Sequence, residues 1–211
     1  MTMQFLVVDD HPLMRKGIRQ LLEEAYVSAD VQEVDSGEAA VERVRHCAYS
    51  LVLLDVSMPG LSGLETLERI ARTRPGQRVL MLSMHSENEM ALQALRGGAS
   101  GYVTKDHAAD QLLGAIARIL GGGRYVSAEF ASVLAARFAE GTEGPPHMRL
   151  TAREFRVLCM LASGVTPTEI ASDLSLSVKT VSTYRARILE KLGVHSNADL
   201  TRYALQHGLI Q

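Results

Sequence analysis

Five polar side chains stand where apolar, strand-like runs of the sequence end. Asp9 and Asp10 follow one such run, Asp55 and Ser83 follow two others, and Lys105 comes just past a fourth. In an open parallel sheet the loops after the carboxyl ends of the strands form the ligand crevice, so these side chains can converge there. Three carboxylates, a hydroxyl and a lysine suit phosphoryl transfer. An isolated pair of aspartates after a strand is usually a helix cap or a solvated loop, but the five-residue set makes that interpretation a poor one.

Strand-like and helix-like segments that could position these residues alternate over the first 120 residues. The expected strands are about 4–8, 31–34, 51–54, 79–82 and 101–103, and the expected helices are 12–25, 36–47, 62–72, 88–97 and 108–120. Three of the strands are continuous apolar runs, as expected when helices cover both faces of a parallel sheet. The pattern predicts an α/β doubly wound domain with a five-stranded parallel sheet.

The chain beyond residue 120 has a different organisation. Residues 121–148 read as a linker with a partly helical segment at 126–139 and a stretch rich in Gly and Pro after it. Residues 149–211 then predict a small all-α domain of four helices. Their start signals are the capping-box pairs Thr151–Glu154 and Thr166–Glu169 and the N-cap residues Ser177 and Ser196. The predicted domains are therefore 1–120 and 149–211, joined by the linker 121–148.

The third of these four helices has two different faces. At about 100° per residue, one face is apolar and carries Val178, Val181, Tyr184, Ile188 and Leu192. The opposite face is small, polar and basic, with Lys179, Thr183 and Ala186 flanked by Ser182 and Arg187. The short link 175–177 joins this helix to the preceding one, which is the helix-turn-helix arrangement, and the polar face suits entry into a DNA major groove. A helix with one basic face is more often only solvated, so the flanking caps and the turn carry this interpretation.

Charge and composition narrow the function classes. The 211 residues carry a net charge of −2, but residues 1–120 have 12 Lys and Arg against 16 Asp and Glu (net −4), and residues 121–211 have 10 against 8 (net +2). An acidic first part would gather a divalent cation, and a mildly basic second part is compatible with nucleic acid. The apolar runs are too short to cross a bilayer, and we expect no exported leader. Cys47 and Cys159 are too few for a disulfide framework, so we expect buried, reduced thiols in a cytoplasmic protein.

Taken in order, the motifs resemble a two-component response regulator of the NarL/FixJ class, with a flavodoxin-like receiver domain followed by a LuxR-type helix-turn-helix domain. The receiver motifs are Val8-Asp9-Asp10-His11-Pro12, Leu54-Asp55-Val56-Ser57-Met58-Pro59-Gly60, Leu82-Ser83 and Gly101-Tyr102-Val103-Thr104-Lys105. The motifs of the second domain are Leu150-Thr151-Ala152-Arg153-Glu154, Glu169-Ile170-Ala171 and Lys179-Thr180-Val181-Ser182-Thr183-Tyr184-Arg185. The resemblance covers essentially the whole chain.

The resemblance implies a role for each residue of the acidic site. Asp55 is the expected phosphoacceptor, which a sensor histidine kinase would phosphorylate. Asp9, Asp10 and Asp55, with the main-chain carbonyl of Ser57, are the expected ligands of one Mg²⁺. Lys105 would pair with an oxygen of the phosphoryl group. The protein would catalyse its own phosphorylation and dephosphorylation without being a turnover enzyme.

Further residues are implied for switching, DNA binding and dimerisation. Ser83 would hydrogen-bond the phosphoryl group and Tyr102 would rotate into the space that Ser83 leaves, although simple core packing explains Tyr102 equally well. The expected DNA contacts are Lys179, Thr180, Ser182, Thr183, Arg185, Ala186 and Arg187. Arg185 projects near the apolar side, and the sequence leaves open whether it reaches a phosphate or caps the core. Leu200, Tyr203 and Ala204 are candidates for a homodimer interface, with burial in the core as the equal alternative.

Two other functions compete with a phosphorylation-switched regulator of transcription. In the first, the helical domain binds a protein partner rather than DNA. In the second, the protein is a phosphorelay shuttle or a slow phosphatase-like enzyme. The histidines show no ligand spacing, and we expect surface or capping roles for His11, His46, His107, His147, His195 and His207.

Overall fold

The computed structural model describes residues 3–84, 88–105, 109–139 and 145–210. It divides the chain into two compact units, Met1–Leu134 and Ala135–Gln211, which we call the first and second unit. The strands are β1 (Gln4–Val8), β2 (Asp30–Val34), β3 (Leu51–Asp55), β4 (Val79–Ser83) and β5 (Gly101–Thr104). The helices of the first part of the chain are α1 (Pro12–Ala25), α2 (Gly37–His46), α3 (Gly63–Thr73), α4 (Asn88–Arg96), α5 (Ala109–Leu120) and α6 (Ala128–Ala139).

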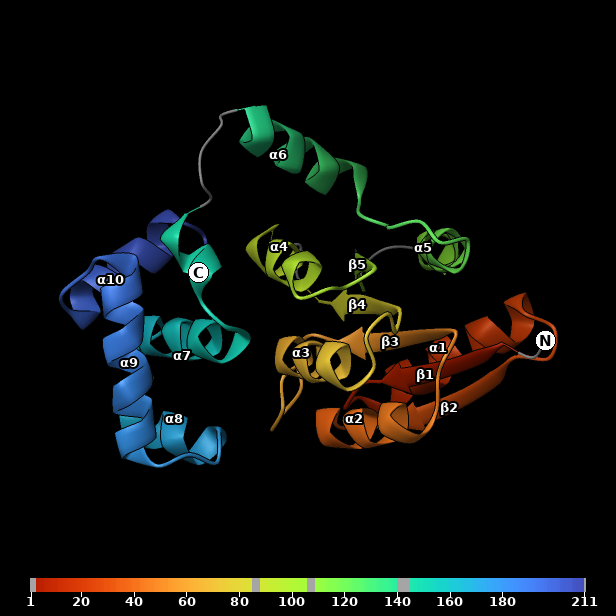
Figure 1. Ribbon diagram of the computed structural model, residues 1–211, viewed down its shortest axis with the longest axis horizontal. Coiled ribbons are helices and arrows are strands. Elements are labelled where there is room, and N and C mark those ends of the chain that lie inside the picture. Colours follow the sequence, from red (N-terminus) through yellow and green to blue (C-terminus); the bar gives the residue numbers. More distant parts are fainter. Residues whose placement is uncertain (1–2, 85–87, 106–108, 140–144, 211) are drawn as a thin grey trace. The chain divides into compact units, whose positions relative to one another are not determined.

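The first unit contains the five-stranded parallel sheet that the sequence predicts, in the order β2-β1-β3-β4-β5. Figure 1 shows α2, α3 and α4 along one side of this sheet and α1 and α5 on the other. The apolar faces of α1 and α5 pack on the sheet through Ile18 and Leu22 from α1 and Ile116 and Ile119 from α5. Strands β3 and β4 are buried along their whole length, which explains why they read as continuous apolar runs.

The chain after α5 returns to the edge of the sheet, which the sequence does not predict. Tyr125 forms an isolated parallel bridge with Gly101. Its backbone N–H donates to the Ser100 carbonyl at 3.0 Å, and its carbonyl accepts from the Tyr102 N–H at 3.2 Å. A Cβ at Gly101 would lie 2.8 Å from the Tyr125 carbonyl oxygen, so this close approach requires glycine. Part of the predicted linker therefore belongs to the first unit.

The second unit contains a short 3₁₀ helix, η1 (Pro146–Arg149), and the helices α7 (Ala152–Ala162), α8 (Pro167–Asp173), α9 (Val178–Leu192) and α10 (Asn197–Gln206). All four predicted start signals are confirmed, because each expected Ser or Thr accepts a hydrogen bond from a backbone N–H of the first turn. Helix α9 buries Val181, Ile188 and Leu192 as expected. Val178 does not follow the predicted face, because it is the first residue of the helix and is 45% exposed.

Two expectations about side-chain burial are wrong. His147 is fully buried, because it packs in η1 against the rings of Phe155, Tyr203 and His207. Cys47 is exposed, because it directly follows the last residue of α2, whereas Cys159 is half-buried, and neither cysteine forms a disulfide. Of the other histidines, His107 lies outside the described residues. Across the described chain, no helix combines the length and the apolar character needed to cross a membrane.

Candidate functional site

The sheet brings the predicted acidic site together at the carboxyl ends of four adjacent strands. Val8 lies opposite Leu54, so Asp9 and Asp55 end neighbouring strands. Asp55 pairs with Leu82 of β4, and Ser83 pairs with Thr104 of β5, which places Lys105 next in line. The four consecutive positions in the strand order explain how residues nearly 100 positions apart in the sequence meet.

Lys105 connects the two buried carboxylates. Its Nζ lies 2.6 Å from Asp9 Oδ2 and 3.0 Å from Asp55 Oδ2. The backbone N–H of Lys105 donates to the Ser83 carbonyl at 2.6 Å, which holds the lysine against the end of β4. All three charged side chains are almost completely buried. Without the ammonium group, two carboxylates would face each other away from water.

The environment of Asp55 favours its neutral form more than water does. Burial raises the pKa of the Asp55 carboxyl, and the charge of Asp9 acts in the same direction. The hydrogen bond and the positive charge of Lys105, with the Ser57 N–H that donates to Asp55 Oδ1 at 3.3 Å, oppose this rise. The pKa remains raised, so an added positive charge at this site would favour the ionised carboxylate.

Gly63 allows α3 to begin directly against the end of β3. Its N–H donates to the Val56 carbonyl at 3.0 Å. A Cβ at position 63 would stand 2.0 Å from the Asp55 carbonyl oxygen, which no side chain can do without moving the strand end. The N-cap residue Ser62 fixes the start of the helix by a capping box with Glu65. Sequence reasoning missed Gly63 as a positioning residue, although a glycine just after a helix-capping serine is a readable signal.

Four side chains are arranged as ligands for a metal ion. One ligand atom from each of Asp9, Asp10, His11 and Asp55 lies within 4.8 Å of the other three. Asp10 Oδ1 is a buried atom that forms no hydrogen bond to any residue that the structure describes, even though His11 Nδ1 is 2.9 Å away. Such an oxygen is costly to bury unless something satisfies it. The sequence predicts the three aspartates, but not His11.

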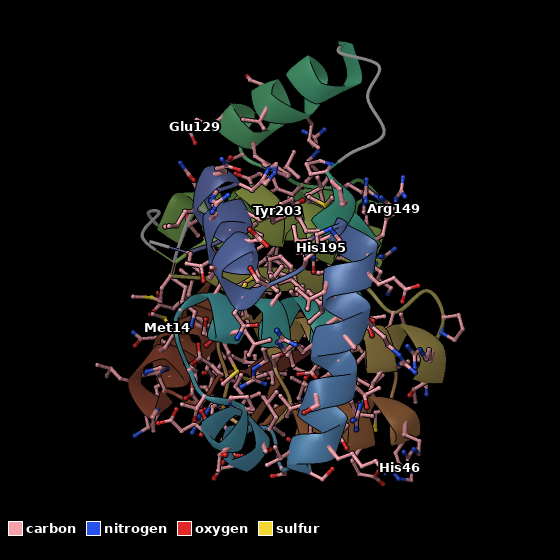
Figure 2. All side chains as sticks on the ribbon, turned by 90° about the vertical axis from the view of Figure 1, so that its left-hand side faces the viewer. Met14, His46, Glu129, Arg149, His195 and Tyr203 are labelled. Carbon is pink, nitrogen blue, oxygen red and sulfur yellow. The ribbon has the colours of Figure 1, made fainter. Side chains whose placement is uncertain are left out.

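Ser83 and Tyr102, the two predicted switch residues, are both buried. Ser83 ends β4 at the acidic site, and Tyr102 lies on β5, where its N–H donates to the Tyr125 carbonyl. Ser57 is exposed and lies two residues beyond Asp55. An apolar cavity of about 400 Å³ opens beside the site, lined by His11, Leu13, Met14, Gly17, Met84 and Lys105. Met14, which Figure 2 labels, marks the α1 side of this cavity.

In the second unit, α9 presents most of the predicted DNA contacts to solvent. Lys179, Ser182, Thr183, Ala186 and Arg187 are exposed. The hydroxyls of Ser182 and Thr183 donate to carbonyls one turn earlier in the helix, at 3.0 Å each, which leaves their oxygens free to accept.

Thr180 and Arg185, the other two predicted contacts, are half-buried and already have partners in the second unit. Thr180 belongs to the cap of α9, because its Oγ1 lies 2.8 Å from Ser177 Oγ. Arg185 Nε donates to Asn197 Oδ1 at 2.6 Å, so this arginine is tied to the start of α10. The structure therefore places Arg185 against its own unit rather than on the outer face of α9.

Two contacts of charged side chains join the helices of the second unit. Lys191 Nζ lies 2.6 Å from Glu154 Oε2, which joins the end of α9 to the start of α7. Arg153 donates to the Leu174 carbonyl at 2.7 Å and so joins α7 to the end of α8. The two contacts therefore tie both helices of the helix-turn-helix segment, α8 and α9, to α7.

The candidate dimer residues lie on α10. Leu200 and Ala204 are fully buried in the second unit, so the core alternative describes both of them. Tyr203 is half-buried and projects from α10 toward η1, where its hydroxyl lies 2.8 Å from His147 Nδ1 (Figure 2). Leu205, which is 54% exposed, is the large apolar side chain that α10 leaves open to solvent.

Comparison with protein families assigns both units. Residues 5–117 match the response regulator receiver domain, and residues 148–204 match the bacterial regulatory proteins of the luxR family. Residues 118–147, which lie between the two matches, are assigned to neither family.

Relatives of known name match over nearly the whole chain. The response regulator UvrY of Escherichia coli is 39% identical over 206 residues, covering 97% of this chain and 94% of UvrY. The transcriptional activator protein ExaE of Pseudomonas putida is 39% identical over 212 residues, covering 99% of both chains. A structure of RcsB from Salmonella enterica bound to the promoter rprA with the phosphomimetic BeF₃⁻ is 28% identical, with a TM-score of 0.67, covering 96% of this chain and 98% of RcsB.

Proposed function

Because this chain belongs to the two-component response regulators that join a receiver domain to a LuxR-type DNA-binding domain, and so is a DNA-binding regulator of transcription, we propose that Asp55 is its phosphoacceptor. The observation that carries the proposal is the position of Asp55 at the end of β3, buried and within 3.0 Å of Lys105 Nζ. A carboxylate oxygen of Asp55 attacks the phosphorus of a phosphohistidine on a sensor kinase. The O–P bond forms as the N–P bond breaks, and the imidazole leaves with its electron pair.

Asp9, Asp10 and Asp55, with the main-chain carbonyl of Ser57, would hold a Mg²⁺ ion. The donor set fits this ion, because it is made of oxygens and includes the buried, unsatisfied Oδ1 of Asp10. When bound, the ion supplies positive charge that offsets the repulsion between the anionic nucleophile and the phosphoryl group. Lys105 supplies a second positive charge. Its buried Nζ, which contacts Asp55 in this structure, would pair with a phosphoryl oxygen instead.

The acyl phosphate on Asp55 would act on the rest of the protein through β4 and β5. Ser83 stands at the end of β4, and its hydroxyl would donate a hydrogen bond to a phosphoryl oxygen. The Ser83 side chain would move toward the phosphoryl group and leave space for Tyr102, which is buried on the neighbouring strand. The hydrogen bond between the Tyr102 N–H and Tyr125 gives the movement a direct route to the segment that follows α5.

DNA binding by this chain would use the exposed face of α9. Lys179 and Arg187 would contact phosphates, while Ser182, Thr183 and Ala186 are small enough to let the helix approach base edges in the major groove. Two copies of the chain would bind paired half-sites about one helical turn of DNA apart. The exposed Leu205 on α10 is the apolar side chain best placed for contact between second units, because Leu200 and Ala204 are buried.

We also propose a cytoplasmic location, where a sensor kinase and the chromosome are both accessible. The phosphoryl group passes to Asp55 once and is then lost to water, so the protein is not a turnover enzyme. The competing function, in which α9 binds a protein partner, predicts little loss of affinity as salt concentration rises. DNA binding predicts a steep loss, because neutralised phosphates release counterions.

The test is binding of the full-length protein to promoter fragments from its own genome, with and without Mg²⁺ and a small-molecule phosphodonor. We expect the donor to tighten binding of the wild type by about tenfold, in line with ordinary allosteric coupling, and to leave Asp55→Asn unchanged. Asp35→Asn is the matched control, because Asp35 is an exposed aspartate of the same unit outside the site. If Asp55→Asn responds to the donor as the control does, Asp55 is not the phosphoacceptor.

A further inference from the structure

We propose that His11 is an additional metal ligand of the acidic site and that its imidazole makes the site prefer Co²⁺, Ni²⁺ or Zn²⁺ to Mg²⁺. The inference rests on the proposed metal site and concerns which ions that site selects. It assigns a chemical role to a residue that the phosphoryl-transfer steps above do not use.

The position of the His11 ring supports a ligand role. His11 Nδ1 lies 2.9 Å from Asp10 Oδ1 and 3.3 Å from Asp9 Oδ1, within the group of four converging ligand atoms. His11 is the N-cap residue of α1, yet its side chain accepts no hydrogen bond from the helix. The ring instead lies over the two aspartates and takes no part in capping the helix.

Asp9 divides its two oxygens between different partners. Oδ2 is 2.6 Å from Lys105 Nζ, while Oδ1 accepts the backbone N–H of His11 at 2.8 Å. The backbone bond fixes residue 11 beside the carboxylate, and the imidazole then lies at the rim of the site, 70% exposed. An ion could therefore approach from solvent and meet the imidazole together with the carboxylates.

The charge of the site calls for a divalent cation, and the donor atoms decide which one. Three carboxylates and one ammonium group leave a net charge of −2 when His11 is neutral. Mg²⁺ prefers oxygen ligands and keeps several waters, so a nitrogen donor adds little to its affinity. Imidazole suits Zn²⁺, Ni²⁺ and related ions, whose affinities for mixed nitrogen and oxygen sites exceed those of the harder ions.

The experiment titrates the full-length protein with MgCl₂ and with CoCl₂ by calorimetry, for the wild type and His11→Ala. We expect His11→Ala to weaken Co²⁺ binding by about tenfold, the low end of the losses measured when a metal site loses a supporting group. Binding of Mg²⁺ should change by less than about twofold, because its oxygen donors remain. His11→Asn, which keeps a polar side chain without imidazole, should behave as His11→Ala does.

His46→Ala is the matched control. His46 is equally exposed and lies 2.8 Å from a single carboxylate oxygen of Glu42, so it reproduces a surface histidine–carboxylate pair without the cluster. Figure 2 labels His46 at the end of α2, well away from Met14, which lines the cavity next to the site. Replacing His46 should leave the affinities of the acidic site for both ions unchanged.

Proton NMR of the Co²⁺-loaded protein gives an independent signature. A ligated His11 should show a strongly shifted, exchangeable imidazole N–H resonance that is absent in His11→Ala and present in His46→Ala. If that resonance persists in His11→Ala, or if Co²⁺ and Mg²⁺ affinities fall equally, His11 is not a ligand. If the wild type binds neither ion, the metal part of the proposed function fails first. If it binds both ions and His11→Ala changes neither the two affinities nor the shifted resonance, the inference alone fails.

Discussion

Glu154 and Glu169 occupy the same position in two capping boxes but differ in what surrounds them. Each accepts a backbone N–H from its N-cap threonine, Thr151 or Thr166. Glu154 is buried and pairs with Lys191 Nζ at 2.6 Å, whereas Glu169 is exposed, and the described residues provide it with no cationic partner. Burial raises the pKa of Glu154, but the bonds from Lys191 and Thr151 outweigh burial, and the pKa is lowered overall.

The first prediction concerns acid stability. A lowered folded-state pKa means that ionised Glu154 stabilises the fold fully above the ordinary pKa of 4.5, and this contribution is lost as pH falls through the folded value. Glu154→Gln should therefore lower the stability of α7 and α9 at pH 7 by about 1 kcal/mol, a modest value because Lys191 is one-third exposed and screened by solvent. Hydrogen exchange of α7 and α9 amides in the full-length protein, measured at pH 7 and at pH 4, would report the effect.

Glu169→Gln is the control for this prediction, because it changes the same capping-box position in α8 without breaking an ion pair. The loss in Glu154→Gln should shrink at the lower pH, where wild-type Glu154 begins to take up a proton. A loss of equal size at both pH values would show that the charge of Glu154 does not contribute.

At the residue scale, the types and spacing of the polar residues predicted those members of the site that the order of the parallel strands brings together. Asp9, Asp55, Ser83 and Lys105 all follow apolar strand runs, and parallel strands bring such ends together whatever the detailed packing. His11 was missed because only the turn of its ring over Asp9 and Asp10, set by tertiary geometry, makes it part of the site.

At the scale of elements, the bridge between Tyr125 and β5 depends on the absence of a side chain at Gly101. An alanine there would place its Cβ 2.8 Å from the Tyr125 carbonyl oxygen and close to the side chains of Leu80 and Ile119. We expect Gly101→Ala to destabilise the first unit by about 1–3 kcal/mol, as overpacking does, and to speed exchange of the Tyr102 N–H. Denaturant unfolding and hydrogen exchange would measure the two effects.

Gly114→Ala serves as the comparison for Gly101→Ala. Gly114 is exposed in the interior of α5, and a Cβ there would meet nothing within 4 Å. This substitution should stabilise the unit by about 0.5–1 kcal/mol, because alanine loses less backbone entropy in a helix. A Gly101→Ala protein as stable as the wild type would mean that the Tyr125 strand segment is not held as the structure describes.

Elements with a local start signal were predicted to within a residue or two, and elements set by distant contacts were not. The capping pairs at Thr151 and Thr166 act within one helical turn, so the sequence alone reveals them. The 3₁₀ helix η1 has no such signal. It forms where His147 reaches Tyr203, 56 positions away, and a contact of that range leaves no periodic trace.

At the scale of the whole molecule, the last prediction asks whether the first unit restrains DNA binding. If the unphosphorylated protein masks α9, a fragment of residues 145–211 should bind promoter DNA without a phosphodonor about tenfold more tightly than the full-length protein, within the ordinary range of allosteric coupling. The fragment must retain η1, because His147 and Met148 are buried in the second unit. A fragment of residues 149–211 would lose the partner of the Tyr203 hydroxyl and should be less stable.

Gel-shift titration of the two fragments and the full-length protein, with circular dichroism to compare their stability, tests this prediction. If residues 145–211 fold but bind no better than the unphosphorylated full-length protein, masking is not the mechanism of control. Phosphorylation would then act by bringing two chains together.

The short bridge at Tyr125 also determines where a fragment that contains only the first unit can end. β5 is an outer strand, and an uncovered outer strand is a template on which other chains can pair. A protein that ends at residue 120 would expose the Tyr102 N–H and the Ser100 carbonyl, both of which Tyr125 now occupies. The few residues after α5 thus protect the sheet against edge-to-edge aggregation, and expression of the isolated first unit should extend through Leu134 to keep it soluble.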